Sequence, residues 1–202
     1  MYADGFVARM VADFVHGQPD ISVYLESATL SEIEGLVAGR QVDVAVTAAE
    51  EVGHGLEIVA SVRRSAVCIF PAGDPLEACA TVSTGDLQGR RFIHLTVGTS
   101  LRALVEQQGL PGQGPGAGTI EVATQSAIVS LVAQGVGVAI VDPEVVPDAL
   151  GPRIGMRALA PPIDWSIVMI TRSGANTSRV AEHFRRWSRE RIPDYLEWLA
   201  ID

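Results

Sequence analysis

Residues 130–143 read Ser-Leu-Val-Ala-Gln-Gly-Val-Gly-Val-Ala-Ile-Val-Asp-Pro, and they constrain the fold more than any other stretch. The pattern predicts an apolar helix that ends at Gly135 and turns within three residues into a strand that stops at Pro143. We expect Gly135 and Gly137 to supply the positive φ angles that a helix terminus and a tight turn require. The unbroken apolar run at 138–141 is typical of a strand covered on both faces, as in a parallel sheet between layers of helices.

The rest of the chain repeats this alternation of helix and strand. We expect helices over residues 5–17, 30–38, 100–108 and 124–135, and a last helix from Asn176 that is interrupted at Pro193. We expect strands at 21–25, 42–46, 56–62, 65–70, 91–95, 120–123 and 165–171, with Arg63 and Arg64 separating two of them. Such alternation with short turns indicates an α/β protein built around a parallel sheet.

The charge of the chain disfavours nucleic acid as a direct partner. Its 15 basic and 24 acidic residues give a net charge of −9, which phosphate backbones repel. No apolar run reaches the length that spans a membrane, and the first residues lack the basic and apolar regions of a signal peptide. We therefore expect a cytoplasmic protein with no membrane partner, and 202 residues suffice for one domain or two small lobes.

Residue patterns for metal binding and for catalysis are missing from the sequence. We expect Cys68 and Cys79 to be free thiols rather than a disulfide, since Cys68 lies in an apolar run. No nucleophile elbow, phosphate loop or dinucleotide-binding loop follows a strand. The histidines also lack the spacing of zinc ligands; they are His16, His54, His94 and His183. The sequence therefore predicts no catalytic residue, no metal and no cofactor.

Four stretches, in this order and spacing, resemble one family. They are the helix-to-strand entry Phe14–Leu25, the turn Leu36–Val46, the strand and loop Val67–Leu76, and residues 130–143. In the third stretch Asp74 stands where histidine is usual. Together they resemble the effector-binding domain of LysR-type transcriptional regulators, and the resemblance covers nearly all of the chain.

The resemblance implies a type 2 periplasmic-binding-protein-like α/β fold, with two Rossmann-like lobes joined by two crossover segments. Lobe one would comprise residues 1–64 and 165–202, and lobe two residues 65–164. The family also carries an N-terminal DNA-binding winged helix-turn-helix and a linker helix, and neither matches any part of this sequence. It places a further strand before the helix at 5–17, and this chain starts within or just after that strand. We therefore interpret the sequence as a fragment of a longer regulator; the alternative is a natural stand-alone domain.

Helix N-termini are the candidate ligand-binding positions. In open α/β folds ligands bind beyond the carboxyl ends of the strands, where helix starts present free N–H groups and partial positive charge. A small organic anion is the predicted ligand, and the resemblance places it between the lobes. The alternatives are that the hydroxyl residues are plain N-caps and that Arg102 is a solvated surface arginine. The candidate residues are Tyr2, Ala3, Ser27, Thr29, Thr99, Ser100, Arg102, Thr124 and Gln125.

The leading hypothesis for function is an effector-sensing domain that controls transcription. A metabolite bound between the lobes would shift the populations of open and closed forms, and the complete protein would bind DNA through its N-terminal domain. The resemblance implies a homodimer, and a tetramer in the complete regulator. One alternative is a stand-alone or transport-type solute-binding protein of the same architecture. Another is a dimerisation module without a working ligand site.

Overall fold

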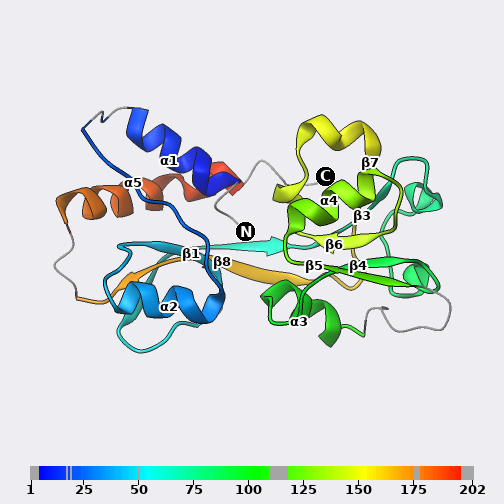
Figure 1. Ribbon diagram of the computed structural model, residues 1–202, viewed down its shortest axis with the longest axis horizontal. Coiled ribbons are helices and arrows are strands. Elements are labelled where there is room, and N and C mark those ends of the chain that lie inside the picture. Colours follow the sequence, from blue (N-terminus) through cyan, green and yellow to red (C-terminus); the bar gives the residue numbers. More distant parts are fainter. Residues whose placement is uncertain are drawn as a thin grey trace. The chain divides into compact units, whose positions relative to one another are not determined.

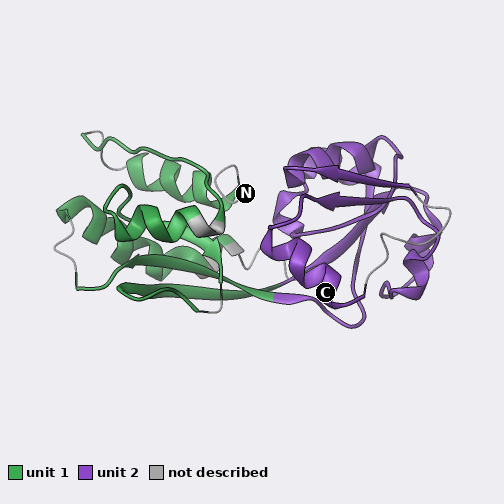
Figure 2. Ribbon diagram, turned by 60° about the horizontal axis from the view of Figure 1, so that its bottom comes forward, with its two compact units in different colours: residues 1–64, 165–202 green, residues 65–164 purple. Residues whose placement is uncertain are grey.

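The computed structural model describes residues 5–16, 18, 20–49, 51–109, 118–174 and 178–196. The chain forms two compact units, one of residues 1–64 with 165–202 and the other of residues 65–164 (Figure 2). It passes from one unit to the other twice, after Arg64 and after Asp164. Each unit combines helices with a small sheet, so the fold is α/β.

Unit 1 contains a three-stranded sheet in the order β1 (Ala45–Ala48), β8 (Asp164–Arg172) and β2 (Leu56–Ser65). Strands β1 and β8 run antiparallel. Helix α2 (Leu30–Ala38) packs on this sheet through a small apolar core. Its fully buried members are Val37, Val168 and Ile170.

Helices α1 (Phe6–His16) and α5 (Arg179–Leu196) lie side by side in unit 1 (Figure 1). The three-to-four-residue spacing of apolar side chains gives α1 one buried face, as the sequence predicts. The ring of Phe14 on that face makes edge contacts with Phe184 at 5.0 Å and Trp187 at 5.5 Å between ring centroids. Burying these aromatic side chains is what joins α1 to α5.

Unit 2 has strand β3 (Val67–Pro71) between β6 (Ala139–Val141) and β7 (Ile154–Ala158), antiparallel to both. Strands β4 (Phe92–Leu95) and β5 (Thr119–Val122) form a parallel pair. A single parallel bridge from Phe92 to Val138 links β4 to the segment that enters β6.

Helices and short turns complete unit 2. Helix α3 (Ser100–Gln107) connects β4 to β5, and helix α4 (Gln125–Ala133) connects β5 to β6. Figure 1 shows α3 and α4 on opposite sides of these strands. In the described part of unit 2, four short 3₁₀ turns span Pro75–Ala78, Gly85–Leu87, Pro143–Val145 and Asp148–Arg153.

The expectation of a parallel sheet around the strand at 138–141 is wrong in part. Strands β4 and β5, joined by a helix, are parallel, and the bridge to the segment before β6 is parallel as well. Strand β3 enters from β2 without a crossover helix and runs antiparallel to β6 and β7. Strand β7 pairs with β3 along five residues, and the sequence analysis did not predict it. The parallel pair β4 and β5 is joined by a helix crossover, whereas the antiparallel partners of β3 come from a distant part of the chain.

The expected strand at 21–25 is also wrong, because this segment has no regular secondary structure. Strand β1 pairs only with β8, and no strand of the described chain pairs with residues 21–25. Three of its apolar side chains remain exposed, Val23 at 47%, Tyr24 at 77% and Leu25 at 44%, and Ile21 is half-buried. An alternating apolar pattern predicts a strand only if a neighbouring strand supplies hydrogen bonds and cover.

Three boundaries differ from the expected ones. Strand β2 continues through Arg63 and Arg64, and the break before β3 falls at Ala66. The expected strand at 42–46 is β1, which begins three residues later. Helix α5 continues past Pro193 to Leu196, so the proline does not interrupt it. Proline removes one backbone N–H, but its fixed φ is that of a helix, and only one turn follows it here.

The glycines of the turn before β6 have two different roles. Gly135 has φ +78°, as predicted, because the chain leaves α4 in the left-handed region. Gly137 has no positive φ, which corrects the prediction for that position. A Cβ on Gly137 would lie 2.5 Å from the carbonyl oxygen of Arg91, so the residue is needed for close backbone approach. That approach lets Val138 N donate to the same carbonyl at 3.0 Å.

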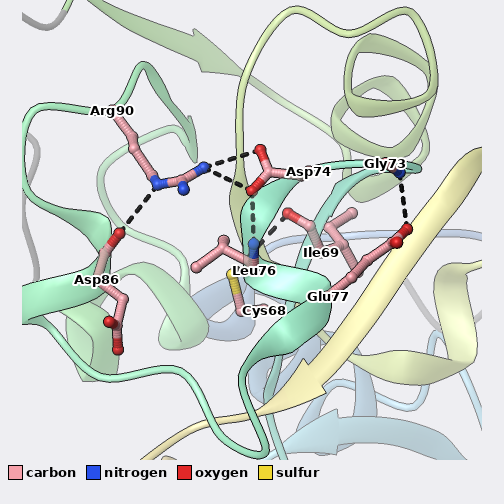
Figure 3. A network of polar contacts seen from close by, with 8 residues as sticks. All are labelled: Cys68, Ile69, Gly73, Asp74, Leu76, Glu77, Asp86 and Arg90. Carbon is pink, nitrogen blue, oxygen red and sulfur yellow. Dashed lines mark hydrogen bonds and ion pairs between the residues drawn. The ribbon is translucent and has the colours of Figure 1, made fainter.

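A polar network closes the loop after β3 (Figure 3). Nη1 of Arg90 donates to both carboxylate oxygens of Asp74 at 2.8 Å, and Nε donates to the carbonyl of Asp86 at 2.9 Å. Asp74 Oδ1 also accepts from Leu76 N at 2.9 Å and caps the first 3₁₀ turn. Aspartate at this position, where the family usually has histidine, therefore carries both a cap and an ion pair.

Cys68 and Cys79 are free thiols in different environments. Cys68 lies in β3 with no exposed surface, and burial raises its pKa to about 12. Cys79 is partly exposed, so only its thiol is open to reagents. We expect a maleimide to label one cysteine per chain in the native protein, at Cys79, and two in denaturant, as measured by intact mass. Rapid labelling of both thiols in the native chain would contradict this assignment.

Within the described ranges, no helix is long and apolar enough to cross a membrane. In the same part of the chain, no group of three or more His, Cys, Asp or Glu side chains could hold a metal ion.

Candidate functional site

The parallel pair β4 and β5 brings two helix starts to one edge of unit 2. The strands are in register at their carboxyl ends, where Leu95 is opposite Val122. Thr96 N donates to the carbonyl of Val122 at 3.0 Å, which extends the pairing by one bond. Helix α3 begins five residues after Leu95, and α4 begins three residues after Val122. The predicted residues Thr99 and Thr124 therefore both lie beyond the same edge of the sheet.

The start of α3 has free backbone donors. The Thr99 hydroxyl donates to the carbonyl of Thr96 at 3.2 Å and does not cap the helix. The first intrahelical hydrogen bond runs from Ala103 N to Thr99 O, so three earlier N–H groups point out of the helix. In the described chain no side-chain oxygen accepts from them. Ser100 is half-buried, and Val97 in the preceding loop is 73% exposed. Free N–H groups at a helix start favour negative charge, and here they lie beside an exposed apolar side chain.

The start of α4 is capped by the chain itself. Thr124 Oγ1 accepts from Ala127 N at 3.2 Å and from the hydroxyl of Ser126 at 3.1 Å. Gln125 is 3% exposed, and its Oε1 accepts from Asp142 N at 2.9 Å. The side chain of Gln125 thus joins α4 to the end of β6, and only its backbone belongs to the helix start.

At the start of α2 in unit 1, the carboxylate of Glu32, a residue of the helix itself, accepts hydrogen bonds from Thr29. Thr29 N and Thr29 Oγ1 donate to Glu32 Oε2 at 2.8 and 2.7 Å. The Thr29 hydroxyl bond lowers the pKa of Glu32, so the carboxylate stays ionised. Thr29 is therefore a capping residue, as the plain N-cap interpretation has it. Ser27 is exposed, and the predicted residues Tyr2 and Ala3 lie outside the described residues.

Arg102 is not a solvated surface arginine, which was the alternative to a contact with the ligand. Its side chain is only 11% exposed. Nε donates to Glu106 at 2.7 Å, and Nη1 donates to the carbonyl of Leu95 at 3.2 Å and to Glu121 at 3.4 Å. The guanidinium is thus engaged within unit 2, since the end of β4 offers a carbonyl within its reach.

His94 is a polar residue of this region that the sequence analysis considered only as a metal ligand. It lies in β4, is 5% exposed, and its ring is 4.4 Å from that of Phe92. Its buried Nε2 has no hydrogen-bond partner in the described chain. Burial lowers the pKa of His94 to about 4, and the charge of Arg102 acts in the same direction. The position of His94 within the predicted apolar strand at 91–95 was the signal in the sequence that its side chain is buried.

The chain matches the family model described as LysR substrate binding domain over residues 1–193. The regulatory protein NocR of Agrobacterium tumefaciens (strain T37) is 28% identical over 183 residues, which cover 89% of this chain and 60% of NocR. The transcriptional activator protein LysR of Escherichia coli (strain K12) is 21% identical over 170 residues, which cover 84% of this chain and 55% of LysR. The chain thus spans little more than half the length of these relatives.

Solved structures agree on the fold. The reduced OxyR regulatory domain from Pseudomonas aeruginosa aligns with a TM-score of 0.74 and 17% identity, covering 92% of this chain and 91% of that one. The CcmR regulatory domain from Synechocystis PCC6803, in complex with 2-PG, aligns with a TM-score of 0.75 and 17% identity, covering 92% and 90%. The type 2 periplasmic-binding-protein-like fold is therefore confirmed. On the family match, the chain belongs to the LysR substrate-binding domains, the effector-binding part of LysR-type transcriptional regulators.

Proposed function

We propose that this domain senses a small organic anion at the α3 edge of unit 2. The observation that carries the proposal is the uncapped start of α3, where three backbone N–H groups have no acceptor in the described chain. Thr99 and Ser100 add hydroxyl groups at the same place, and the exposed Val97 offers an apolar contact. The start of α2 is a weaker candidate, because Glu32 already holds the donors of Thr29.

The family match supports a regulatory role over an enzymatic or transport role. NocR and LysR are regulators, and the CcmR domain was solved with a small molecule, 2-PG. We infer that the complete protein binds DNA through an N-terminal domain outside the matched region, acts as a homodimer, and works in the cytoplasm. The placement of the effector between the two lobes stays a prediction of the family resemblance.

Calorimetric titration and thermal unfolding of the 202-residue chain test the proposal. The probes are 2-PG, succinate, benzoate and inorganic phosphate, each at millimolar concentration, with neutral succinamide as the matched control. We expect at least one anion to bind, and an anion at 100 times its Kd to stabilise the fold by about 2.7 kcal/mol. The anion should bind far more tightly than succinamide, because the free N–H groups and the helix dipole act on negative charge.

Two substitutions test whether the anion binds at the start of α3. Ser100→Ala removes a hydroxyl donor and should weaken binding about tenfold where the hydroxyl contacts the charge. Thr99→Val removes the hydroxyl that donates to the carbonyl of Thr96, so it should weaken binding by loosening the loop before α3. Ser27→Ala, at an exposed position in unit 1, is the control and should leave the affinity unchanged if α3 alone binds the charge. If no probe binds, or if both α3 variants bind as wild type does, an anion site at this helix start is ruled out.

A further inference from the structure

The guanidinium of Arg102 joins three elements of unit 2. Nε donates to Glu106 one turn further along α3, at 2.7 Å. Nη1 donates to the carbonyl of Leu95, the last residue of β4, at 3.2 Å. The same nitrogen reaches Glu121 in β5 at 3.4 Å. One largely buried side chain therefore ties the first turn of α3 to both strands that precede the candidate site.

The loop between Leu95 and Ser100 has few other restraints in the described structure. Thr96 N donates to β5 at 3.0 Å, and the Thr99 hydroxyl donates back to Thr96 at 3.2 Å within the loop. Val97 makes little contact, since it is largely exposed. The loop that carries Thr99 is thus held mainly at its two ends, and Arg102 acts on both.

We propose that Arg102 is a positioning residue of the α3 site: by holding Leu95, Glu106 and Glu121 together, it sets the loop that carries Thr99 and the free N–H groups. This inference rests on the proposed function, because it assigns Arg102 a role in that site. Two carboxylates already accept from the guanidinium, which leaves the cluster with a net negative charge, so on this proposal Arg102 does not itself pair with the effector.

His94 gives this arrangement a measurable signal. Its imidazole is buried beside Phe92 without a hydrogen bond at Nε2. The charged groups that act on it are Arg102 and Glu106 of α3 and Glu121 of β5. Burial lowers the pKa of His94 most, Arg102 lowers it further, and the two carboxylates raise it. The pKa of His94 therefore depends on where the guanidinium of Arg102 lies.

Two roles for Arg102, positioning of the loop and direct pairing with the anion, predict opposite changes in affinity when Glu106 or Glu121 is replaced. We would measure binding of the tightest anion among 2-PG, succinate, benzoate and inorganic phosphate to Arg102→Met, Glu121→Gln and Glu106→Gln, with Arg153→Met as the control. If Arg102 positions the loop, all three variants bind more weakly, by about tenfold for Arg102→Met, the scale known for supporting residues around bound metals. If Arg102 pairs with the anion, removing its competing carboxylates strengthens binding, and the proposal fails. Arg153 is exposed and its variant should bind as wild type does.

A ligand-free measurement decides the loop-setting role on its own. In Arg102→Met we expect hydrogen exchange at the amides of residues 96–101 to accelerate, with exchange in β3 unchanged, and the NMR-detected pKa of His94 to rise. Glu121 is half-exposed, so Glu121→Gln provides the same test in a variant expected to fold, with the His94 pKa falling instead. Unchanged exchange at residues 96–101 in both variants would overturn the inference, whatever the His94 pKa does, because the loss of charge alone shifts that pKa. If exchange changes but the wild-type chain binds no probe, the proposed function fails while the loop-setting role of Arg102 stands.

Discussion

Replacing Gly155 with alanine should lower the free energy of unfolding by about 3 kcal/mol. Gly155 lies in β7 directly opposite Phe70 of β3. A Cβ at Gly155 would lie 2.0 Å from Cε2 of Phe70 and 2.7 Å from its Cδ2. The ring has no exposed surface, so it cannot turn into solvent to make room. Urea denaturation followed by circular dichroism measures the effect.

Two variants control this prediction. Gly151→Ala adds the same atom where nothing lies within 4 Å and φ is not positive, so it should change stability by less than about 1 kcal/mol. Phe70→Leu removes the ring atoms that collide with the new methyl group. The double variant Gly155→Ala/Phe70→Leu should therefore be less destabilised than the sum of the single variants. A Gly155→Ala chain as stable as the wild type would show that β3 and β7 separate without cost.

Asp74→Ala should lower the free energy of unfolding by about 2–3 kcal/mol, for two reasons that act together. The variant removes the carboxylate that receives Arg90 at 2.8 Å, leaving a guanidinium whose side chain is only 26% exposed. It also removes the cap on Leu76 N. Urea denaturation again gives the measurement.

A double-mutant cycle separates the ion pair from the cap. Asp74→Asn keeps an oxygen for Leu76 N but loses the charge, and Arg90→Met removes the other partner. If the pair contributes, Asp74→Asn destabilises the wild type more than it destabilises the Arg90→Met chain. Equal effects in both backgrounds would mean that the cap alone matters and that the Arg90 contact is neutral.

Local signals in the sequence predicted the elements that local interactions determine. Helix α2 has the predicted bounds, because Thr29 and Glu32 form a capping box at its start and Gly39 follows its end. The helix after Thr124 and the left-handed Gly135 were predicted for the same reason. These residues determine the backbone conformation of their own turn, so it can be predicted without knowing any distant contact.

Features that depend on distant partners could not be predicted in this way. The alternating pattern at 21–25 forms no strand, since no neighbouring strand pairs with it in the described chain. The sequence around Gly137 predicts a positive φ. Its role in the structure is close approach to the carbonyl of Arg91, a contact that only the fold creates. At the site, the exposure of Arg102 and the inward side chain of Gln125 depend on Leu95 and Asp142, which only the fold brings near.

The carboxylate of Glu32 already accepts hydrogen bonds from Thr29 at the start of α2, so it competes with any anion that would bind there. An anion that reaches Thr29 gains only the difference between its own hydrogen bonds and those of Glu32. The ionised carboxylate of Glu32 also repels any anionic group near the start of α2, whereas it does not repel a neutral hydroxyl or amide group. An anion at the start of α2 would therefore have to displace Glu32, whereas in the described chain no capping side chain has to be displaced at the start of α3.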